Sequence, residues 1–401
     1  MSKQRVVILG AGYAGLRTVK ELQKKNLDIE IIIVNKNDYH YESTQLHEVA
    51  AGTEPADKIC FNVSDVINKE KVKFIKDTVT KIDKDSRVVL LENTGELTYD
   101  YLVVALGFVS ETFGIPGVDA YSLPLVDINT AEAAKRHLDA TLANYQKSKD
   151  PQDLSIVVCG AGFTSVEYLG EITNRIPKLA DKMNFPKEQV SITCIEAMPK
   201  LLPMFSEKLG GYGIDVLKKR GVDFKVGTPI KEIKDKTVVY EENGELKEIK
   251  ANTIIWTTGV KGSPVIGESG FDERRGRVMV EPDLTVTGYP EIFMIGDVSA
   301  VMDKDSGRPY PTTAQIALKQ GDSVAENLRL TLNNQTTIPF EYKSLGTVAS
   351  IGNNVGIGNV MGREVRGYMG SIMKKNIINK SLLEVGNTKT LLKKGRFDYY
   401  H

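Results

Sequence analysis

Two glycine-rich segments of the sequence have the spacing of loops that bind phosphate. The first consists of Gly10, Ala11, Gly12, Tyr13, Ala14 and Gly15, and the second runs from Gly160 through Gly162 to Ser165. In such loops the first glycine permits a tight turn, the second lets phosphate approach the backbone, and the third lets helix and strand pack closely. Ser165 stands at the third position of the second loop and is still small. We therefore expect two dinucleotide sites.

Each glycine segment lies between a strand and a helix, which is the context that a dinucleotide site requires. Val6–Leu9 is a continuous apolar run, and a helical stretch to about Lys25 and a strand at Ile29–Val34 follow the first loop. Ser155–Cys159 and Val190–Ile195 flank the second loop and its helix in the same way. Continuous apolar runs are typical of parallel strands buried on both faces. The pattern predicts an α/β chain with two Rossmann-like domains.

The residue that closes the second strand of each repeat helps to select the ligand. Glu196 occupies this position in the second repeat, where a carboxylate would accept hydrogen bonds from both ribose hydroxyls and repel a 2′-phosphate. We therefore expect this site to prefer NADH to NADPH. Asn35 occupies the position in the first repeat, and its amide leaves the first ligand open.

Three later features bear on how the domains are connected. A short hairpin over 285–295 ends in Gly296-Asp297, and the apolar strands Tyr101–Gly107 and Thr253–Gly259 each end in glycine. With the two loops, these features resemble the two-dinucleotide-binding flavoprotein superfamily. The resemblance implies an FAD domain into which an NAD domain is inserted. It also implies that Asp297 contacts the flavin, and that Gly107 and Gly259 mark the crossings between the domains.

The composition argues against several other classes of protein. The chain has 401 residues, more than one ordinary domain, and 41% of them are hydrophobic. Lys and Arg number 52, as do Asp and Glu, so no net charge attracts the whole molecule to nucleic acid. The three cysteines, Cys60, Cys159 and Cys194, have no CxxC spacing, and we expect no metal site.

The cysteine positions also narrow the reaction. Disulfide reductases of this superfamily need a thiol pair soon after the first loop, and residues 36–50 contain no cysteine. Sulfide:quinone oxidoreductases need a cysteine late in the chain, and none follows Cys194. We expect Cys159 and Cys194 to be small buried residues of the core. Without a thiol relay, electrons must leave the flavin directly.

Residues 308–321 contain Ala314-Gln315 at the expected start of a helix, soon after Asp297. This stretch closely resembles the flavin- and quinone-facing motif of type II NADH dehydrogenases. Further matches to that family lie at 35–41, 105–114, 162–171 and 391–397. The resemblance covers nearly the whole chain. It implies a homodimer that passes two electrons from NADH, through noncovalently bound FAD, to a membrane quinone without pumping protons.

The same resemblance assigns roles to individual residues. It implies flavin contacts for residues 10–14, Asn35, Lys36, His40, Val79, Asp297, Ala314, Gln315 and Lys374. It places Gly160, Gly162, Glu167, Glu196 and Gly259 with the nicotinamide nucleotide. The catalytic candidates are Glu171, Gln315 and Lys374. The residues alone leave alternatives: His40 as a packed polar loop residue, Glu171 as a solvated helix carboxylate, and Lys375 in place of Lys374.

The C-terminal part of the chain carries the local charge. Nine Lys or Arg and two Glu lie between Arg363 and Arg396, and apolar residues are interspersed among them. The stretch 345–362 is uncharged but rich in glycine and asparagine, which favours a hairpin over a membrane span. The N-terminus has no signal-peptide pattern. We expect peripheral attachment to anionic lipid on the cytoplasmic side, although these residues would also suit a solvated basic tail.

The expected division is an FAD domain at 1–118 and 282–335, an NADH domain at 119–281, and a membrane-associating region at 336–401. Two other functions fit the same pair of domains. One is a soluble flavoprotein reductase of a protein or small acceptor, and the other is a redox-sensing flavoprotein with slow turnover.

Overall fold

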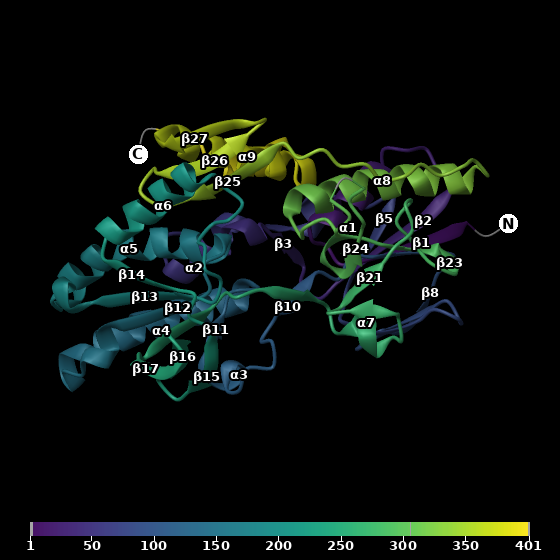
Figure 1. The fold of residues 1–401 in the computed structure, drawn as a ribbon. Coiled ribbons are helices and arrows are strands. Elements are labelled where there is room, and N and C mark those ends of the chain that lie inside the picture. The colour runs from purple at the N-terminus through teal and green to yellow at the C-terminus, as the bar shows by residue number, and fades with distance from the viewer. Residues whose placement is uncertain (1–2, 305, 400–401) are drawn as a thin grey trace.

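The computed structural model describes residues 3–304 and 306–399 and consists of two lobes with the C-terminal segment lying across them (Figure 1). The first lobe contains a six-stranded sheet in the order β22-β23-β9-β1-β2-β5. The bounds are Thr285–Val286, Tyr289–Met294, Tyr101–Val104, Gln4–Leu9, Ile29–Asn35 and Val72–Lys76 in that order. β1 pairs in parallel with β2 and β9, while the hairpin β22–β23 adds its second strand in parallel to β9.

Alternate side chains of strand β1 pack against layers on opposite faces of the sheet. Val6 and Ile8 pack with the helices α1 (Tyr13–Leu22) and α8 (Ala314–Leu332), whereas Val7 and Leu9 pack against the opposite layer. That layer contains β6 (Val79–Asp83), β7 (Val88–Leu91), β8 (Gly95–Thr98), α7 (Val265–Glu268) and β21 (Arg277–Met279). The four apolar residues are fully buried, as their uninterrupted run predicts.

The second lobe repeats the arrangement with a parallel sheet in the order β11-β18-β12-β13-β14. The bounds are Leu123–Pro124, Thr253–Trp256, Ser155–Cys159, Ser191–Glu196 and Val222–Val226 in that order. One face is covered by α2 (Leu46–Ala51), α4 (Ile128–Ser148), α5 (Phe163–Met183) and α6 (Glu207–Lys219). The other carries the meander β15 (Ile230–Lys234), β16 (Thr237–Glu242) and β17 (Glu245–Lys250).

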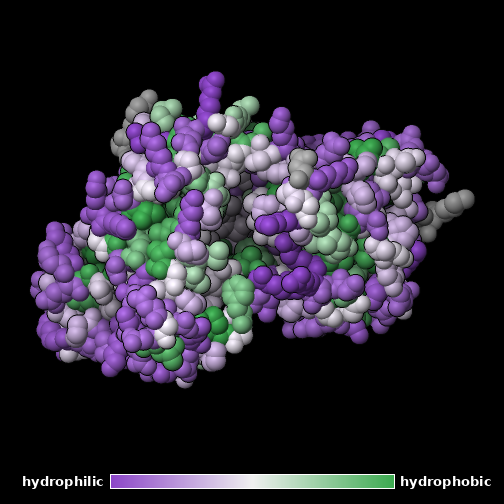
Figure 2. Space-filling model, in the orientation of Figure 1, coloured by the Kyte–Doolittle hydropathy of each residue, from purple (hydrophilic) through white to green (hydrophobic). Residues whose placement is uncertain are grey.

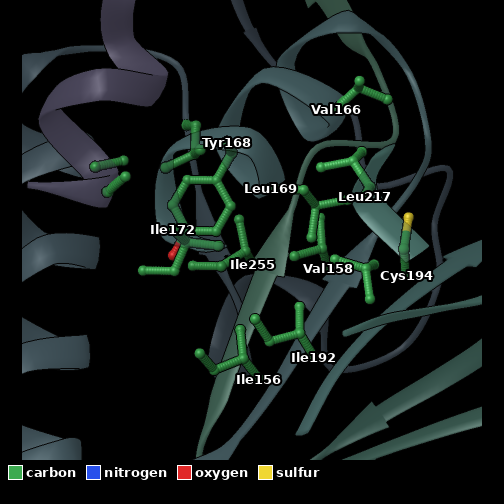
Figure 3. Packing of buried hydrophobic residues seen from close by; sticks show 14 of the residues in the cluster. Ile156, Val158, Val166, Tyr168, Leu169, Ile172, Ile192, Cys194, Leu217 and Ile255 are labelled. Atoms are coloured by element: carbon green, nitrogen blue, oxygen red, sulfur yellow. The ribbon is translucent and has the colours of Figure 1, made fainter. Parts of the chain in front are cut away.

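The residues of α5 that face the sheet form an apolar cluster with it. Figure 3 shows Tyr168 and Leu169 of this helix over Ile156 and Val158 of the sheet, with Cys194 at the edge of the same cluster. Both Cys159 and Cys194 are fully buried free thiols. The prediction that they are core residues is confirmed.

Two antiparallel strands, β10 (Phe108–Ser110) and β19 (Val260–Gly262), join the lobes at the crossings. The Trp256 indole Nε1 donates to the Glu111 carbonyl at 2.9 Å, which ties the end of one crossing to the end of the other. The two Rossmann-like sheets and the inserted arrangement predicted from the sequence are confirmed.

The C-terminal segment forms a small sheet and two helices. The elements are β25 (Gly346–Ser350), β26 (Gly356–Val360), β27 (Arg363–Gly367), α9 (Tyr368–Val385) and α10 (Thr388–Lys394). The predicted hairpin over 345–362 is confirmed as β25 and β26. Ile378, Leu382 and Val385 of α9 enter the core of the first lobe. Much of the segment is therefore part of the folded body.

The remaining elements are short. They are β3 (Tyr39–Tyr41), β4 (Cys60–Asn62), α3 (Val118–Tyr121), β20 (Glu273–Arg274), β24 (Ser299–Ala300) and the 3-10 turns at 43–45, 56–59, 63–65, 151–154, 187–189 and 296–298. Within the residues that the structure describes, no helix is both long enough and apolar enough to cross a bilayer.

Candidate active site

The first glycine loop has the backbone geometry that a dinucleotide needs. Gly10 has a φ of +100°, and a Cβ at this position would lie 2.2 Å from the Ala105 carbonyl oxygen. A Cβ at Gly15 would lie 2.0 Å from the Gly10 carbonyl oxygen, whereas a Cβ at Gly12 would meet nothing within 4 Å. The first and third glycines therefore permit close packing, and the second leaves open space in front of the loop.

The open space continues into a cavity of about 350 Å³. It is lined by residues 10–14, Asn35, Lys36, His40, Val79, Gly107 and Asp297, among others. Helix α1 begins beside it at Gly12 without a side-chain cap, so N–H groups of its first turn remain available to an anion. The predicted flavin contacts are thus brought together, except Ala314, Gln315 and Lys374, which lie outside this cavity.

Asp297 is one of the residues that line the cavity. Burial raises the pKa of its carboxyl to about 6, although Arg277 acts in the opposite direction. A half-buried carboxyl facing a cavity is suited to accept hydrogen bonds from ligand hydroxyls. The sequence did not indicate Ser263, Pro264 and Val265, which line the same cavity after the second crossing. These residues belong to no motif, so only the tertiary structure reveals them.

The second glycine loop has matching geometry. Helix α5 begins at Gly162, again without a side-chain cap, and Gly160 has a φ of +94°. Ser165, which stands where the third glycine is expected, is buried. Its hydroxyl lies 2.7 Å from the Thr257 hydroxyl and forms a hydrogen bond to the residue that follows β18. A dinucleotide phosphate can approach this loop as it can the first.

Glu196 has a structural task in addition to the predicted one. Its Oε2 accepts from the Ala161 N–H at 2.7 Å and its Oε1 accepts from the Met198 N–H at 2.8 Å. Asn35 does the same in the first lobe, where its Oδ1 accepts from the Ala11 N–H at 3.0 Å. Both strand-end side chains therefore fix the loop that they follow, which the sequence did not indicate.

A buried charged cluster joins α5 to α9. The Lys374 Nζ lies 2.7 Å from Glu167 Oε1, and the His47 Nδ1 lies 3.5 Å from Glu167 Oε2. Burial opposes ionisation of Glu167, but the charge and hydrogen bond of Lys374, with the hydrogen bond from the Ser350 N–H, outweigh it and lower the pKa of this carboxyl. Burial lowers the pKa of His47 to about 4, so its ring is neutral at pH 7. Glu167 is therefore a carboxylate held by an ammonium group.

Glu171 lies one turn further along α5 and differs from Glu167. Burial raises the pKa of its carboxyl, and the nearby Glu167 adds to this effect. Two carboxylates four residues apart thus have pKa values shifted in opposite directions. Such a pair is typical of sites that hold and transfer protons. The predicted role of Glu171 remains a proposal.

The two neighbouring lysines lie in different surroundings. The Lys374 side chain is 13% exposed and faces α5, whereas Lys375 binds Asp398 Oδ2 at 3.2 Å and the Asp398 carbonyl at 2.7 Å. Lys375 therefore fastens the end of the chain to α9. Lys374 is the lysine that points into the cluster.

Gln315 is the second residue of α8, which begins at Ala314 behind the N-cap Thr313. The Gln315 Oε1 accepts from the Tyr342 hydroxyl at 2.5 Å and from the Leu345 N–H at 3.0 Å. These bonds hold the linker between α8 and β25. The remaining polar atom of the side chain is the amide nitrogen, a donor.

Known proteins are similar to nearly the whole chain. Residues 4–321 match the pyridine nucleotide-disulphide oxidoreductase family. The type II NADH:quinone oxidoreductase of Staphylococcus aureus strain NCTC 8325 is 46% identical over 399 residues, which are 98% of this chain and 99% of the relative. The chain belongs to that family. The protein of strain COL matches equally well.

Solved structures support this family's fold at lower identity. The NDH2 of Plasmodium falciparum in complex with NADH has a TM-score of 0.88 and 17% identity over 98% of this chain and 97% of its own. The sulfide:quinone oxidoreductase of Aquifex aeolicus has a TM-score of 0.78 and 20% identity, over 96% and 92%. No cysteine follows Cys194 in the present chain.

Proposed function

We propose that the chain oxidises NADH and reduces a membrane quinone with FAD bound at the first glycine loop. The observation that carries the proposal is the 46% identity to type II NADH:quinone oxidoreductases over 98% of the chain. The chain is an oxidoreductase of this family. The finer points proposed here are the assignment of each site, the absence of proton pumping, attachment to the cytoplasmic side of the membrane and assembly as a homodimer.

The residues of the first cavity fit FAD. The uncapped start of α1 at Gly12 would bind the pyrophosphate, and Asp297 would accept hydrogen bonds from the ribityl chain. When bound, FAD supplies the chemistry that accepts a hydride from NADH and gives two electrons to a quinone. Val79, Lys36 and Gly107 would bind its remaining parts along the cavity wall.

The second loop would place NADH opposite the flavin. Gly160 and Gly162 leave the backbone free to receive its pyrophosphate, and Glu196 would bind the ribose hydroxyls from the end of β13. Gly259 lies between β18 and β19, and Figure 2 shows a hollow in the molecular surface between the two lobes. By holding both reactants, the two loops convert an encounter in solution into a reaction between oriented groups.

The cluster around Glu167 would hold protons and transfer them to the quinone. A quinone that receives two electrons also takes up two protons. Glu171 has a raised pKa and can hold a proton, while Lys374 carries three on its ammonium group. Gln315 would direct its amide nitrogen to the quinone while Tyr342 fixes the side chain. These residues position and supply protons as the quinone is reduced.

The C-terminal segment supplies the membrane-binding surface in this proposal. Met361 is 80% exposed and Leu392 is 72% exposed, and Met369 and Phe397 are also exposed. The same segment of the sequence contains nine Lys or Arg between Arg363 and Arg396. Apolar side chains among Lys and Arg suit the interface of an anionic bilayer.

Turnover with a short-chain quinone tests the proposal. NADH should be oxidised rapidly and one quinone reduced per NADH, and flavin should appear in the supernatant after acid precipitation because it is bound noncovalently. Slow NADH oxidation that a quinone does not accelerate would favour a redox sensor. Rapid transfer to a protein acceptor without quinone reduction would favour a soluble reductase.

A further inference from the structure

A buried glutamine of α8 holds the turn that carries Asp297. Gln320 is 2% exposed, and its side-chain amide makes two hydrogen bonds to residues 296–299. Its Oε1 accepts from the Gly296 N–H at 2.6 Å, and its Nε2 donates to the Ser299 hydroxyl at 3.1 Å. The Ser299 hydroxyl in turn donates to the Gly296 carbonyl at 2.9 Å. The amide and the hydroxyl together fix the two ends of the turn.

The turn is short and depends on these bonds. Gly296 has a φ of +71°, and residues 296–298 form a single 3-10 turn between β23 and β24. A single turn of this kind makes few hydrogen bonds of its own. Backbone N–H and C=O groups inside a protein need partners, and Gln320 and Ser299 supply them to Gly296. Without Gln320, the Gly296 N–H would lose its acceptor.

The same turn places the Asp297 carboxyl group at the FAD cavity. Gly296 and Asp297 are both among the residues that line this cavity. Within residues 3–304 and 306–399, no hydrogen bond holds the Asp297 carboxyl group, although the charge of Arg277 acts on it. The direction of this group is therefore set by the backbone on either side of it. Gln320 holds that backbone.

The next residue of α8 contacts another part of the cavity wall. A Cβ at Gly321 would lie 2.8 Å from the Ala14 carbonyl oxygen and 2.9 Å from the Arg17 Cβ, so α8 crosses α1 in close contact. Ala14 belongs to the first glycine loop and also lines the cavity. Two consecutive residues of α8 thus contact the turn of Asp297 and the helix that follows the glycine loop.

We propose that Gln320 is a positioning residue for FAD, which acts through the turn at 296–299 and holds the Asp297 carboxyl group where the ribityl chain meets it. The inference rests on the proposed binding of FAD in this cavity. Ala317 of α8 lines the cavity, whereas Gln320 bonds to the turn behind it. Groups that bind a ligand keep the required geometry when supporting hydrogen bonds hold them in this way. Because α8 begins at Ala314-Gln315, one helix would support the contacts of both FAD and quinone.

Gln320→Met removes both hydrogen bonds and nearly keeps the length of the side chain. FAD should dissociate from the variant holoenzyme about tenfold faster than from the wild type, measured by the recovery of flavin fluorescence. The matched control is Asn327→Leu on the same helix. Asn327 is 0% exposed, and its Nδ2 donates to the carbonyls of Asp283 at 3.0 Å and Ile338 at 2.9 Å. The control should have a lower Tm but release FAD within about twofold of the wild-type rate.

A double-mutant cycle tests whether Gln320 acts through Asp297. Asp297→Ala should itself speed the release of FAD, and adding Gln320→Met to it should change the rate by no more than about twofold. Effects of the two substitutions that multiply in full would overturn the proposal. Wild-type release by Gln320→Met would also overturn it, as would equally fast release by Asn327→Leu.

Two further outcomes are assigned in advance. If Gln320→Met fails to fold, Ser299→Ala takes its place in the cycle and is judged by the same criterion, because it removes the hydroxyl that bonds to both Gln320 and Gly296. Wild-type protein that holds no FAD would overturn the proposed FAD site. Wild-type protein that retains FAD, with unchanged release by Gln320→Met, would overturn the role of Gln320 alone.

Discussion

The Lys374 ammonium lies 2.7 Å from the Glu167 carboxylate, and this ion pair connects α9 to the helix that begins at the second glycine loop. The C-terminal segment thereby contributes a buried side chain to the region between the two dinucleotide loops. Both partners are largely removed from solvent, so each would be costly to leave alone. The pair therefore combines a structural role with a place in the proposed proton chemistry.

Replacing each lysine in turn should distinguish the role of Lys374 from that of Lys375. Lys374→Gln removes the ammonium group from the cluster, and we expect kcat for quinone reduction to fall about tenfold or more. Lys375→Gln alters bonds to Asp398 and Asn354, outside the cluster around Glu167, and should retain kcat within about twofold. Steady-state rates for both variants under identical conditions check the assignment. Equal losses would mean that the lysines act through the folding of the C-terminal segment.

The two carboxylates of α5 should affect stability with opposite dependence on pH. The pKa of Glu167 is lowered in the folded state, so its contribution is present above the unfolded pKa and is lost as the pH falls through the folded pKa. Glu167→Gln should therefore destabilise the protein at pH 7, by roughly 3 kcal/mol, because Lys374 loses its buried partner. The penalty should shrink towards acid pH.

Glu171 should behave in the reverse way. Burial raises its pKa, so the folded state binds this proton more tightly, and the benefit is lost as the pH rises through the folded pKa. Glu171→Gln should thus raise Tm relative to the wild type more at pH 8 than at pH 5. Thermal unfolding of both variants across this range is the measurement. Parallel pH profiles would contradict the opposite shifts.

Glu196→Gln should narrow the preference for NADH over NADPH, because a neutral amide would not repel a 2′-phosphate. The amide oxygen can still accept from either Ala161 or Met198, but one of these two backbone N–H groups loses its acceptor. We therefore also expect a loss of about 1 kcal/mol in stability with FAD content unchanged. The ratio of kcat/KM for the two nucleotides provides the test. An unaltered ratio would place the ribose elsewhere.

Gln315→Ala should slow quinone reduction more than reduction of the flavin by NADH. The structure supplies a matched control, since Tyr342→Phe removes one of the two hydrogen bonds that hold Gln315 and leaves its amide in place. The control should show a smaller loss, which stopped-flow measurement of the two half-reactions can resolve. Equal slowing of both half-reactions by Gln315→Ala would make this residue a flavin-positioning group.

Membrane attachment is tested more clearly by surface substitutions than by truncation. Removing α9 would expose core partners of Ile378, Leu382 and Val385, so loss of binding after truncation would be ambiguous. Leu392→Glu changes a side chain that is 72% exposed and should release the protein from anionic liposomes in flotation. Leu246→Glu, at a similarly exposed position on β17, is the control and should still float. Release of both variants alike would contradict attachment through the C-terminal segment.

Local sequence patterns predicted the strands, loops and crossings because they depend on short-range chemistry. The run Val6–Leu9 had to be buried on both faces, and Gly10 had to adopt a positive φ. The start of α8 at Ala314 and the hairpin of β25 and β26 were also predicted from patterns of neighbouring residues. Each of these features needs only a few consecutive side chains.

The pairings between distant segments could not be predicted in this way. His47, Glu167 and Lys374 come from three helices, and no spacing in the chain reports that they meet. Arg396 is a stronger example: the sequence placed it in a basic tail, but it is buried and binds Glu48, Glu54 and Gln45. Arg396 thus serves the fold, as Lys374 and Lys375 of the same tail also do, because the buried carboxylates around it require a cation.

The most direct test of the central claim is an anaerobic single turnover in two steps. One equivalent of NADH should bleach the flavin absorbance completely, whereas NADPH at the same concentration should do so far more slowly. Addition of one equivalent of a short-chain quinone should then restore the absorbance rapidly and yield one quinol. Flavin that NADH bleaches but quinone fails to reoxidise would contradict transfer from NADH to quinone.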